Sequence, residues 1–205
     1  MPRSIFKLLC ILFISTNSYA FLEIGGDFSY DRNIFGAERQ SKSTSRTWGG
    51  TISAHIFHYT AVELNFYQTE DNTIVNETVT YGDLGISVLG QQTHVRSQNF
   101  GVGLRQDFAS RKSFIQPSLS LGYARMFRDA TTNYTIRNDL DGSTETSIQP
   151  TTKTVDDSMF GTFSLKLRLH KRFHLRGSVR TYIRAMDWNG AKDDLKYTVG
   201  FTCII

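Results

Sequence analysis

The sequence predicts an all-β protein, folded as an eight-stranded antiparallel up-and-down transmembrane β-barrel. Three observations lead to this prediction. The chain opens with an export signal, eight later segments alternate apolar and polar residues, and no later stretch is apolar for the 18 or more residues of a membrane helix. A bilayer leaves no partner for unpaired backbone groups, so only helices and closed barrels span it. An exported, alternating chain of this kind is therefore expected to form a barrel.

Residues 1–20 have the pattern of a cleaved secretory signal peptide. Arg3 and Lys7 precede the apolar run 8–14, and small residues stand before the expected cleavage point. The apolar run is shorter than the roughly 20 residues that a transmembrane helix needs. We therefore expect residues 21–205 to form the barrel domain.

The composition of the remaining chain disfavours several functional classes. Cys203 is its one cysteine, which excludes an internal disulfide. Without Arg3 and Lys7, Lys+Arg falls from 23 to 21 against 19 acidic residues, a net charge of +2. An exported and nearly neutral chain is not expected to bind nucleic acid.

The eight predicted strands place bulky apolar residues on one face and small or polar residues on the other. Most are close to the 9–11 residues that a tilted strand needs to cross a bilayer. In order, their apolar members are Leu22, Ile24, Phe28 and Tyr30 in 22–30; Trp48, Ile52 and Ile56 in 48–56; Val62, Leu64 and Phe66 in 62–67; Phe100, Val102 and Leu104 in 99–105; Ile115, Leu119, Leu121 and Tyr123 in 115–124; Phe163, Leu165, Leu167 and Leu169 in 163–169; Phe173, Leu175 and Val179 in 173–184; and Tyr197, Val199, Phe201 and Ile205 in 196–205.

The connections between these strands alternate in length. Short turns are predicted at 57–60, 110–112 and 170–172, and longer connections at 31–47, 69–92, 128–157 and 186–194. Outer-membrane barrels have short periplasmic turns and long outer loops, so both termini are expected in the periplasm. The four longer connections together carry a net charge of −7, and within 73–92 the alternation predicts a strand ribbon above the membrane.

The apolar face is expected to meet lipid. A soluble barrel of the lipocalin type alternates in the same way, but its polar face meets solvent and has no reason to be small. Here the polar face is rich in glycine, serine and alanine, which suit the narrow interior of an eight-stranded barrel. Aromatic residues also gather at both ends of the apolar face, as in membrane interfaces: Tyr30, Trp48, Tyr123 and Phe127 at one end, and Phe57, Tyr59, Phe108 and Phe173 at the other.

The last strand has the layout of an assembly signal. Tyr197, Val199, Phe201 and Ile205 alternate up to the end of the chain, although Ile205 stands where such signals usually have Phe or Trp. In its overall pattern the chain resembles the small eight-stranded bacterial outer-membrane barrels, of the OmpA transmembrane domain, OmpX and opacity-protein type. The resemblance implies a monomer in the outer membrane of a Gram-negative bacterium. Its implied partners are outer-membrane lipid and lipopolysaccharide, the barrel-assembly machinery, and an extracellular protein that contacts the loops.

Charged residues on the polar face predict a plugged lumen. Buried charges must be paired, so acids on the early strands are expected to meet bases on the later ones. The bases outnumber the acids, which predicts a further compensating acid, anion or water. The predicted network comprises Glu23, Asp27, Glu63, Arg105, Lys166, Arg168, Arg176, Arg180 and Arg184.

The leading functional hypothesis is a non-enzymatic barrel whose outer loops mediate surface contact or support the cell envelope. A narrow ion or small-solute channel is the second hypothesis, and a lipid A-modifying enzyme is the third. The enzyme would need a serine and a histidine on the lipid face. His94 and Ser97 have opposite parity, whereas His174 and Ser178 share a parity that points inward. We therefore expect no catalytic residue, no cofactor and no metal site.

Overall fold

The computed structural model describes residues 21–36, 39–184 and 195–205. The only helix in these ranges is the one-turn 3-10 helix η1 (Gly82–Leu84). None of the described segments is a helix long and apolar enough to cross a membrane. The strands are β1 (Leu22–Phe35), β2 (Ser41–His55), β3 (Thr60–Val75), β4 (Val79–Tyr81), β5 (Ile86–Asp107), β6 (Ile115–Asn138), β7 (Thr144–Ile148), β8 (Thr152–Arg168), β9 (Phe173–Arg184) and β10 (Lys196–Ile204).

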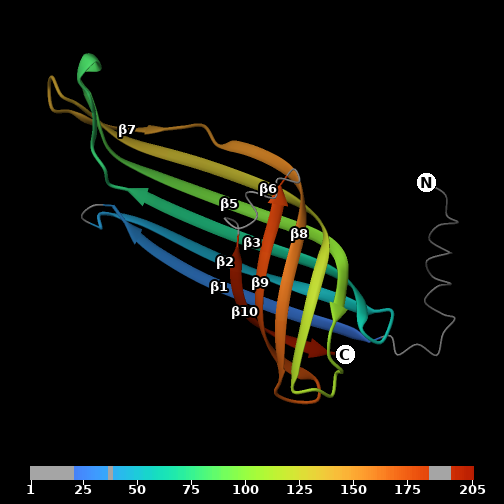
Figure 1. Cartoon of the computed structure of the whole chain (residues 1–205). Helices are drawn as coiled ribbons and strands as arrows, with labels where there is room; N and C mark the ends of the chain where they lie inside the picture. The colour runs from blue at the N-terminus through green and yellow to red at the C-terminus, as the bar shows by residue number, and fades with distance from the viewer. Residues whose placement is uncertain (1–20, 37–38, 185–194) are drawn as a thin grey trace, which may run out of the picture.

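Eight of these strands close into an antiparallel barrel, which confirms the predicted fold class (Figure 1). The order around the barrel is β1, β2, β3, β5, β6, β8, β9 and β10. The first and last strands pair from Glu23 opposite Ile204 to Phe28 opposite Val199. Beyond that pairing, Leu22 N–H donates to the Ile205 carbonyl at 3.3 Å, and Ile205 N–H donates back at 2.8 Å. The ends of the barrel strands therefore meet, and the barrel has no open edge along these pairs.

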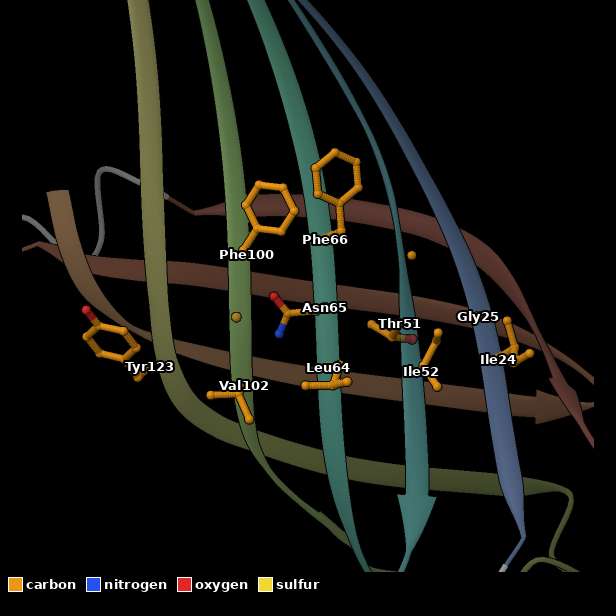
Figure 2. A pocket seen from close by; sticks show the side chains of 12 residues that line it. Ile24, Gly25, Thr51, Ile52, Leu64, Asn65, Phe66, Phe100, Val102 and Tyr123 are labelled. Carbon is orange, nitrogen blue, oxygen red and sulfur yellow. The ribbon is translucent and has the colours of Figure 1, made fainter. Parts of the chain in front are cut away.

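The two faces of the barrel wall follow the predicted parity. Figure 2 shows Ile24, Ile52, Leu64 and Val102 on neighbouring strands, all on the outer wall. Leu64 is 54% exposed, whereas its neighbour Glu63 is 2% exposed. The barrel thus has apolar residues outside and charged residues inside, the reverse of a soluble protein. Only lipid makes such an outer surface favourable.

The interior is narrow enough to require close approach of the backbone. A Cβ on Gly122 would lie 2.3 Å from the Val102 carbonyl oxygen and 2.6 Å from the Phe160 ring. Phe160 packs with Ala124, Met126 and Tyr182 in a small buried apolar cluster. Glycine at this position therefore makes room for an aromatic side chain inside the barrel.

The strands continue far beyond the length needed to cross a bilayer, which corrects three of the predicted loops. Most of 31–47, 69–92 and 128–157 is strand, and β6 alone has 24 residues. The predicted ribbon is confirmed, since β3 and β5 remain paired up to Val75 opposite Gln91. The added short strands β4 and β7 pair with β5 and β6. Outside 73–92, polar residues interrupt the apolar alternation of these extensions, so the pattern that marks the membrane part ends before the strands do. The fourth predicted loop, 186–194, lies outside the described residues.

Candidate functional site

Charged side chains fill the inner wall on the half of the barrel that holds the termini. Glu23 and Asp27 both point inward from β1 because they stand an even number of residues apart on a strand. Arg105 and Asp107 point inward from β5, and Lys166 from β8, by the same parity. Closure of β10 on β1 brings the first strand near β8 and β9, so residues more than 140 apart in sequence meet across the lumen.

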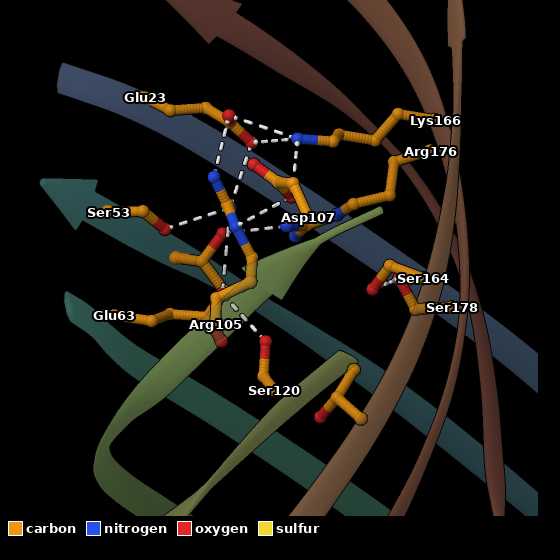
Figure 3. A network of polar contacts seen from close by, with 12 residues as sticks. Glu23, Ser53, Glu63, Arg105, Asp107, Ser120, Ser164, Lys166, Arg176 and Ser178 are labelled. Carbon is orange, nitrogen blue, oxygen red and sulfur yellow. Dashed lines mark hydrogen bonds and ion pairs between the residues drawn. The ribbon is translucent and has the colours of Figure 1, made fainter. Parts of the chain in front are cut away.

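The first cluster is centred on the Glu23 carboxylate (Figure 3). Arg105 binds it with two parallel hydrogen bonds, from Nη1 to Oε1 at 2.9 Å and from Nη2 to Oε2 at 2.8 Å. Lys166 Nζ donates to the same two oxygens at 3.2 and 3.1 Å. Asp107 Oδ1 lies 3.4 Å from Arg105 Nε and 3.6 Å from Lys166 Nζ. Two cations therefore share two carboxylates, all of them 8% exposed or less.

Neighbouring polar groups extend this cluster. Arg105 also donates to Ser53 Oγ at 3.0 Å, and Asp107 Oδ2 lies 2.9 Å from His55 Nε2. Glu63 is more weakly engaged: its Oε2 is 3.7 Å from Arg105 Nη1 and accepts a hydrogen bond from Ser120 at 3.3 Å. The strongest contacts are thus those of Glu23.

A second cluster lies further along the lumen, around Asp27. Arg176 donates to Asp27 through Nε, at 3.0 Å, and through Nη2, and Tyr67 donates its hydroxyl to the same carboxylate. The guanidinium of Arg180 lies 3.6 Å from the centre of the Tyr67 ring and donates to Thr162 Oγ1 at 2.7 Å. Contact with an aromatic face thus stabilises a buried arginine for which the described residues provide no ion pair.

The structure brings together six of the nine residues that the sequence singled out: Glu23, Asp27, Glu63, Arg105, Lys166 and Arg176. Arg180 faces the lumen beside Tyr67 and Phe160. Arg168 is half-buried near the turn to β9 and makes no ion pair with a described residue. Arg184 pairs with Ser158 in the β8–β9 ladder, and its side chain lies outside the described part of the structure.

Sequence reasoning missed Asp107, which is the further acid that the excess of bases required. The signal was present, because Asp107 follows Arg105 by two residues and so shares its face. The predicted strand ended at Arg105, whereas β5 continues to Asp107. Tyr67 shares the inward parity of Glu63, but its contacts with Asp27 and Arg180 depend on the curvature of the closed barrel.

The chemistry of this lumen is that of a charge-paired interior. Among the described residues, no group of three or more His, Cys, Asp and Glu side chains is placed to hold a metal ion. Ser178 bonds to Ser164 at 2.9 Å, and the Nε2 of His174 lies 3.4 Å from Gln116 Nε2. The two members of that histidine–serine pair are therefore engaged with other residues.

No family model matches the sequence, and no curated protein matches it. Solved structures do match. The N-terminal β-barrel domain of Pseudomonas aeruginosa OprF aligns at a TM-score of 0.52 and 11% identity, over 90% of this chain and 97% of that one. The outer membrane protein OprG from Pseudomonas aeruginosa aligns at a TM-score of 0.54 and 14% identity, over 91% of this chain and 95% of that one.

This chain has the fold of a small outer-membrane β-barrel. The outer-membrane barrel fold agrees with the exposed apolar band and with the polar interior. The four members of the predicted assembly strand, Tyr197, Val199, Phe201 and Ile205, lie on the outer wall of this barrel and are 60–70% exposed. At these levels of identity, the likeness to OprF and OprG extends to the fold alone.

Proposed function

We propose that the protein is a non-enzymatic, monomeric outer-membrane barrel whose polar lumen is plugged. Its termini face the periplasm, and its long strand extensions project outside the cell for surface contact or envelope support. The barrel-assembly machinery inserts it by recognising β10. No nucleic acid, cofactor or metal takes part in this role.

The observation that carries the proposal is the network of Glu23, Arg105, Lys166 and Asp107. It joins β1, β5 and β8 and so crosses the lumen rather than lining one wall. Eight strands enclose an interior just wide enough for side chains, so a crossing network leaves little free space. The two hollows beside Tyr182 and Lys196 have volumes of only about 70 and 10 Å³.

The far end of the extensions supports the surface-contact role. Leu84 and Leu140 are 69% and 88% exposed there, although hydrogen bonds hold the tip in place: Asp139 N–H donates to the Gly85 carbonyl at 2.8 Å. Among the described strands β7 pairs with β6 alone, and a strand edge of this kind accepts an added strand from a partner. Asp83 and Asp141 are the sequence neighbours of the exposed leucines, and Glu145 lines a hollow with both leucines, which favours a partner with basic groups.

Solute uptake by vesicles tests the plugged lumen. Liposomes containing the refolded protein should swell in arabinose no faster than protein-free liposomes, whereas liposomes containing a general porin swell quickly. Swelling above the protein-free rate would favour the channel hypothesis instead. Mass spectrometry of lipid A from cells with and without the protein tests the absence of enzymatic activity, and a changed acylation pattern would contradict it. Protease treatment of whole cells tests the orientation, since cleavage is expected in the β6–β7 turn.

A further inference from the structure

The outer wall of the barrel has an apolar groove. It has a volume of about 700 Å³ and runs across β1, β2, β3, β5 and β6, bounded by Ile24, Ile52, Leu64, Val102 and Tyr123 (Figure 2). Glycine occupies two facing outward positions at this wall: Gly50 lines the groove, and Gly26 stands opposite Gly50 on β1. A Cβ added at Gly26 would meet nothing within 4 Å, so the missing side chain at this position leaves open space.

Aromatic residues close the upper end of this groove. Phe66 and Phe100 line it, with ring centroids 4.9 Å apart. Trp48 packs edge-on against Phe66 at 5.7 Å and is 48% exposed on the outer wall. Tryptophan at this position is typical of the boundary between hydrocarbon and headgroups.

A second, polar hollow of about 270 Å³ lies further along β1, β2, β3 and β5, toward their extensions. Tyr30, Lys42, Arg46, Glu70 and His94 are among the residues that line it. Arg46 stands opposite Glu70 in the strand ladder, and Glu70 stands opposite Arg96. Arg96 donates to Gln68 Oε1 at 3.0 Å, and Gln68 donates to Glu70 Oε1 at 2.9 Å.

The charge of this face is opposite to that of the extensions as a whole. The four longer connections sum to −7, yet the outward face of these four strands carries Arg32, Lys42, Arg46 and Arg96 against the single acid Glu70. Alternation turns Asp31 and Asp71 to the other face. The base of the extensions therefore presents a local cationic surface just above the apolar band.

We propose that the groove and the cationic hollow bind one anionic lipid whose headgroup phosphate is not neutralised by a cationic group. A hydrocarbon chain lies in the groove, and the phosphate contacts Arg46, Arg96 and Lys42. Gly50 and Arg46 are four residues apart on β2, roughly 13 Å at 3.3 Å per residue, so one amphiphile spans both parts. Arginine suits phosphate because its planar fork donates two parallel hydrogen bonds. This inference goes beyond the proposed function and requires only that the barrel sit in a bilayer, so its failure and that of the plugged lumen are separate results.

Tryptophan quenching by brominated lipid tests the proposal. The chain has two tryptophans, and Trp188→Phe leaves Trp48, at the top of the groove, as the reporter. The full chain is refolded into phosphatidylcholine vesicles that contain a fixed fraction of dibrominated phosphatidic acid or of dibrominated phosphatidylcholine. Each cationic residue near an anionic headgroup adds about fivefold in binding. We therefore expect at least fivefold preference for phosphatidic acid, reduced to near unity in Arg46→Gln/Arg96→Gln.

Two further variants separate the parts of the site. Gly26→Leu places an apolar side chain in the open space beside Gly50 of the groove and removes no cation, and it should lower the preference severalfold. The matched control is Arg125→Gln, because Arg125 is also an exposed arginine of the outer face but lies on β6, 3.9 Å from Asp157. It should keep the full preference.

Several outcomes would overturn the proposal. One is equal quenching by the two brominated lipids, and another is an unchanged preference in Gly26→Leu. Inorganic phosphate distinguishes free phosphate from lipid as the ligand. If it abolishes the preference more strongly than chloride at equal ionic strength, the cations bind phosphate without the chain. Weak quenching by both lipids, together with cross-linked dimers, would instead assign the groove to a second copy of the protein.

Discussion

Replacing Glu23 by glutamine tests the energetic centre of the lumen. The substitution keeps the shape of the side chain but removes the carboxylate that Arg105 contacts at 2.8 and 2.9 Å and Lys166 at 3.1 Å. Removing one partner of a buried ion pair costs about 3–5 kcal/mol because the other charge stays buried. Asp107 remains within 3.6 Å of both cations and offsets part of this cost, so we expect the lower end of the range.

A loss of about 3 kcal/mol corresponds to a roughly 150-fold change in the unfolding equilibrium. With an m-value of about 2 kcal/mol per molar urea, the midpoint of unfolding should fall by about 1.5 M. The measurement is reversible urea unfolding in lipid vesicles, followed by tryptophan fluorescence. Glu23→Gln/Lys166→Gln should recover part of the loss, since Arg105 then keeps Asp107 as its counter-charge.

Asp157→Asn is the control for this experiment. Asp157 faces Arg125 at 3.9 Å with both side chains at least 60% exposed, and such pairs contribute less than about 1 kcal/mol. The reasoning is refuted if Glu23→Gln shifts the midpoint no more than the control does.

Three more predictions follow from other contacts. Asp27→Asn should lower the free energy of unfolding by about 3 kcal/mol, because Arg176 contacts Asp27 in two places. Glu63→Gln should lower it by about 1 kcal/mol, because the nearest cation atom is 3.7 Å from Glu63. Urea midpoints in the reverse order would contradict this ranking. Gly122→Ala should destabilise the barrel by about 1–3 kcal/mol, since its Cβ would lie 2.3 Å from the Val102 carbonyl oxygen. An unchanged melting temperature would contradict this, because it would mean that the neighbouring backbone moves aside at no cost in stability. At the tip, hydrogen bonds from Ser87 and Arg137 hold the pKa of Asp139 below its usual range. The stability from these bonds is therefore present above the ordinary aspartate pKa and is lost as pH falls through the lowered value, and an NMR titration that gives an ordinary pKa for Asp139 would refute it.

The membrane-spanning part of the fold could be predicted because its chemistry has a strict period. Each strand meets lipid on one side and a narrow polar lumen on the other. The polarity of a side chain, as in Glu63 and Leu64, therefore indicates which face it lies on. The inner position of Glu23, Asp27, Arg105 and Lys166 followed from the same rule. The sequence alone therefore predicts that these four side chains lie on a common face.

The strand extensions and the exact pairs were not predictable in this way. In 128–138, threonine, asparagine and arginine occupy both faces, so the apolar signal stops at the membrane although backbone pairing with β5, and then with β7, continues. Pairing inside the lumen depends on which inward residues reach the same level after closure. The stagger between strands sets that level, and it is a property of the whole barrel. The contacts of Asp27 with Arg176 and Tyr67 therefore cannot be predicted from the sequence of any one strand.

Ion conductance is the most direct measurement of the central claim, that paired charges close the lumen. The purified full chain, inserted in a planar bilayer in potassium chloride, should give no steady channels, and its baseline should match that of the bilayer alone. Ions are the smallest probe of a continuous aqueous path, so they report gaps that larger solutes miss. Discrete, long-lived current steps that scale with the amount of inserted protein would contradict the plugged lumen.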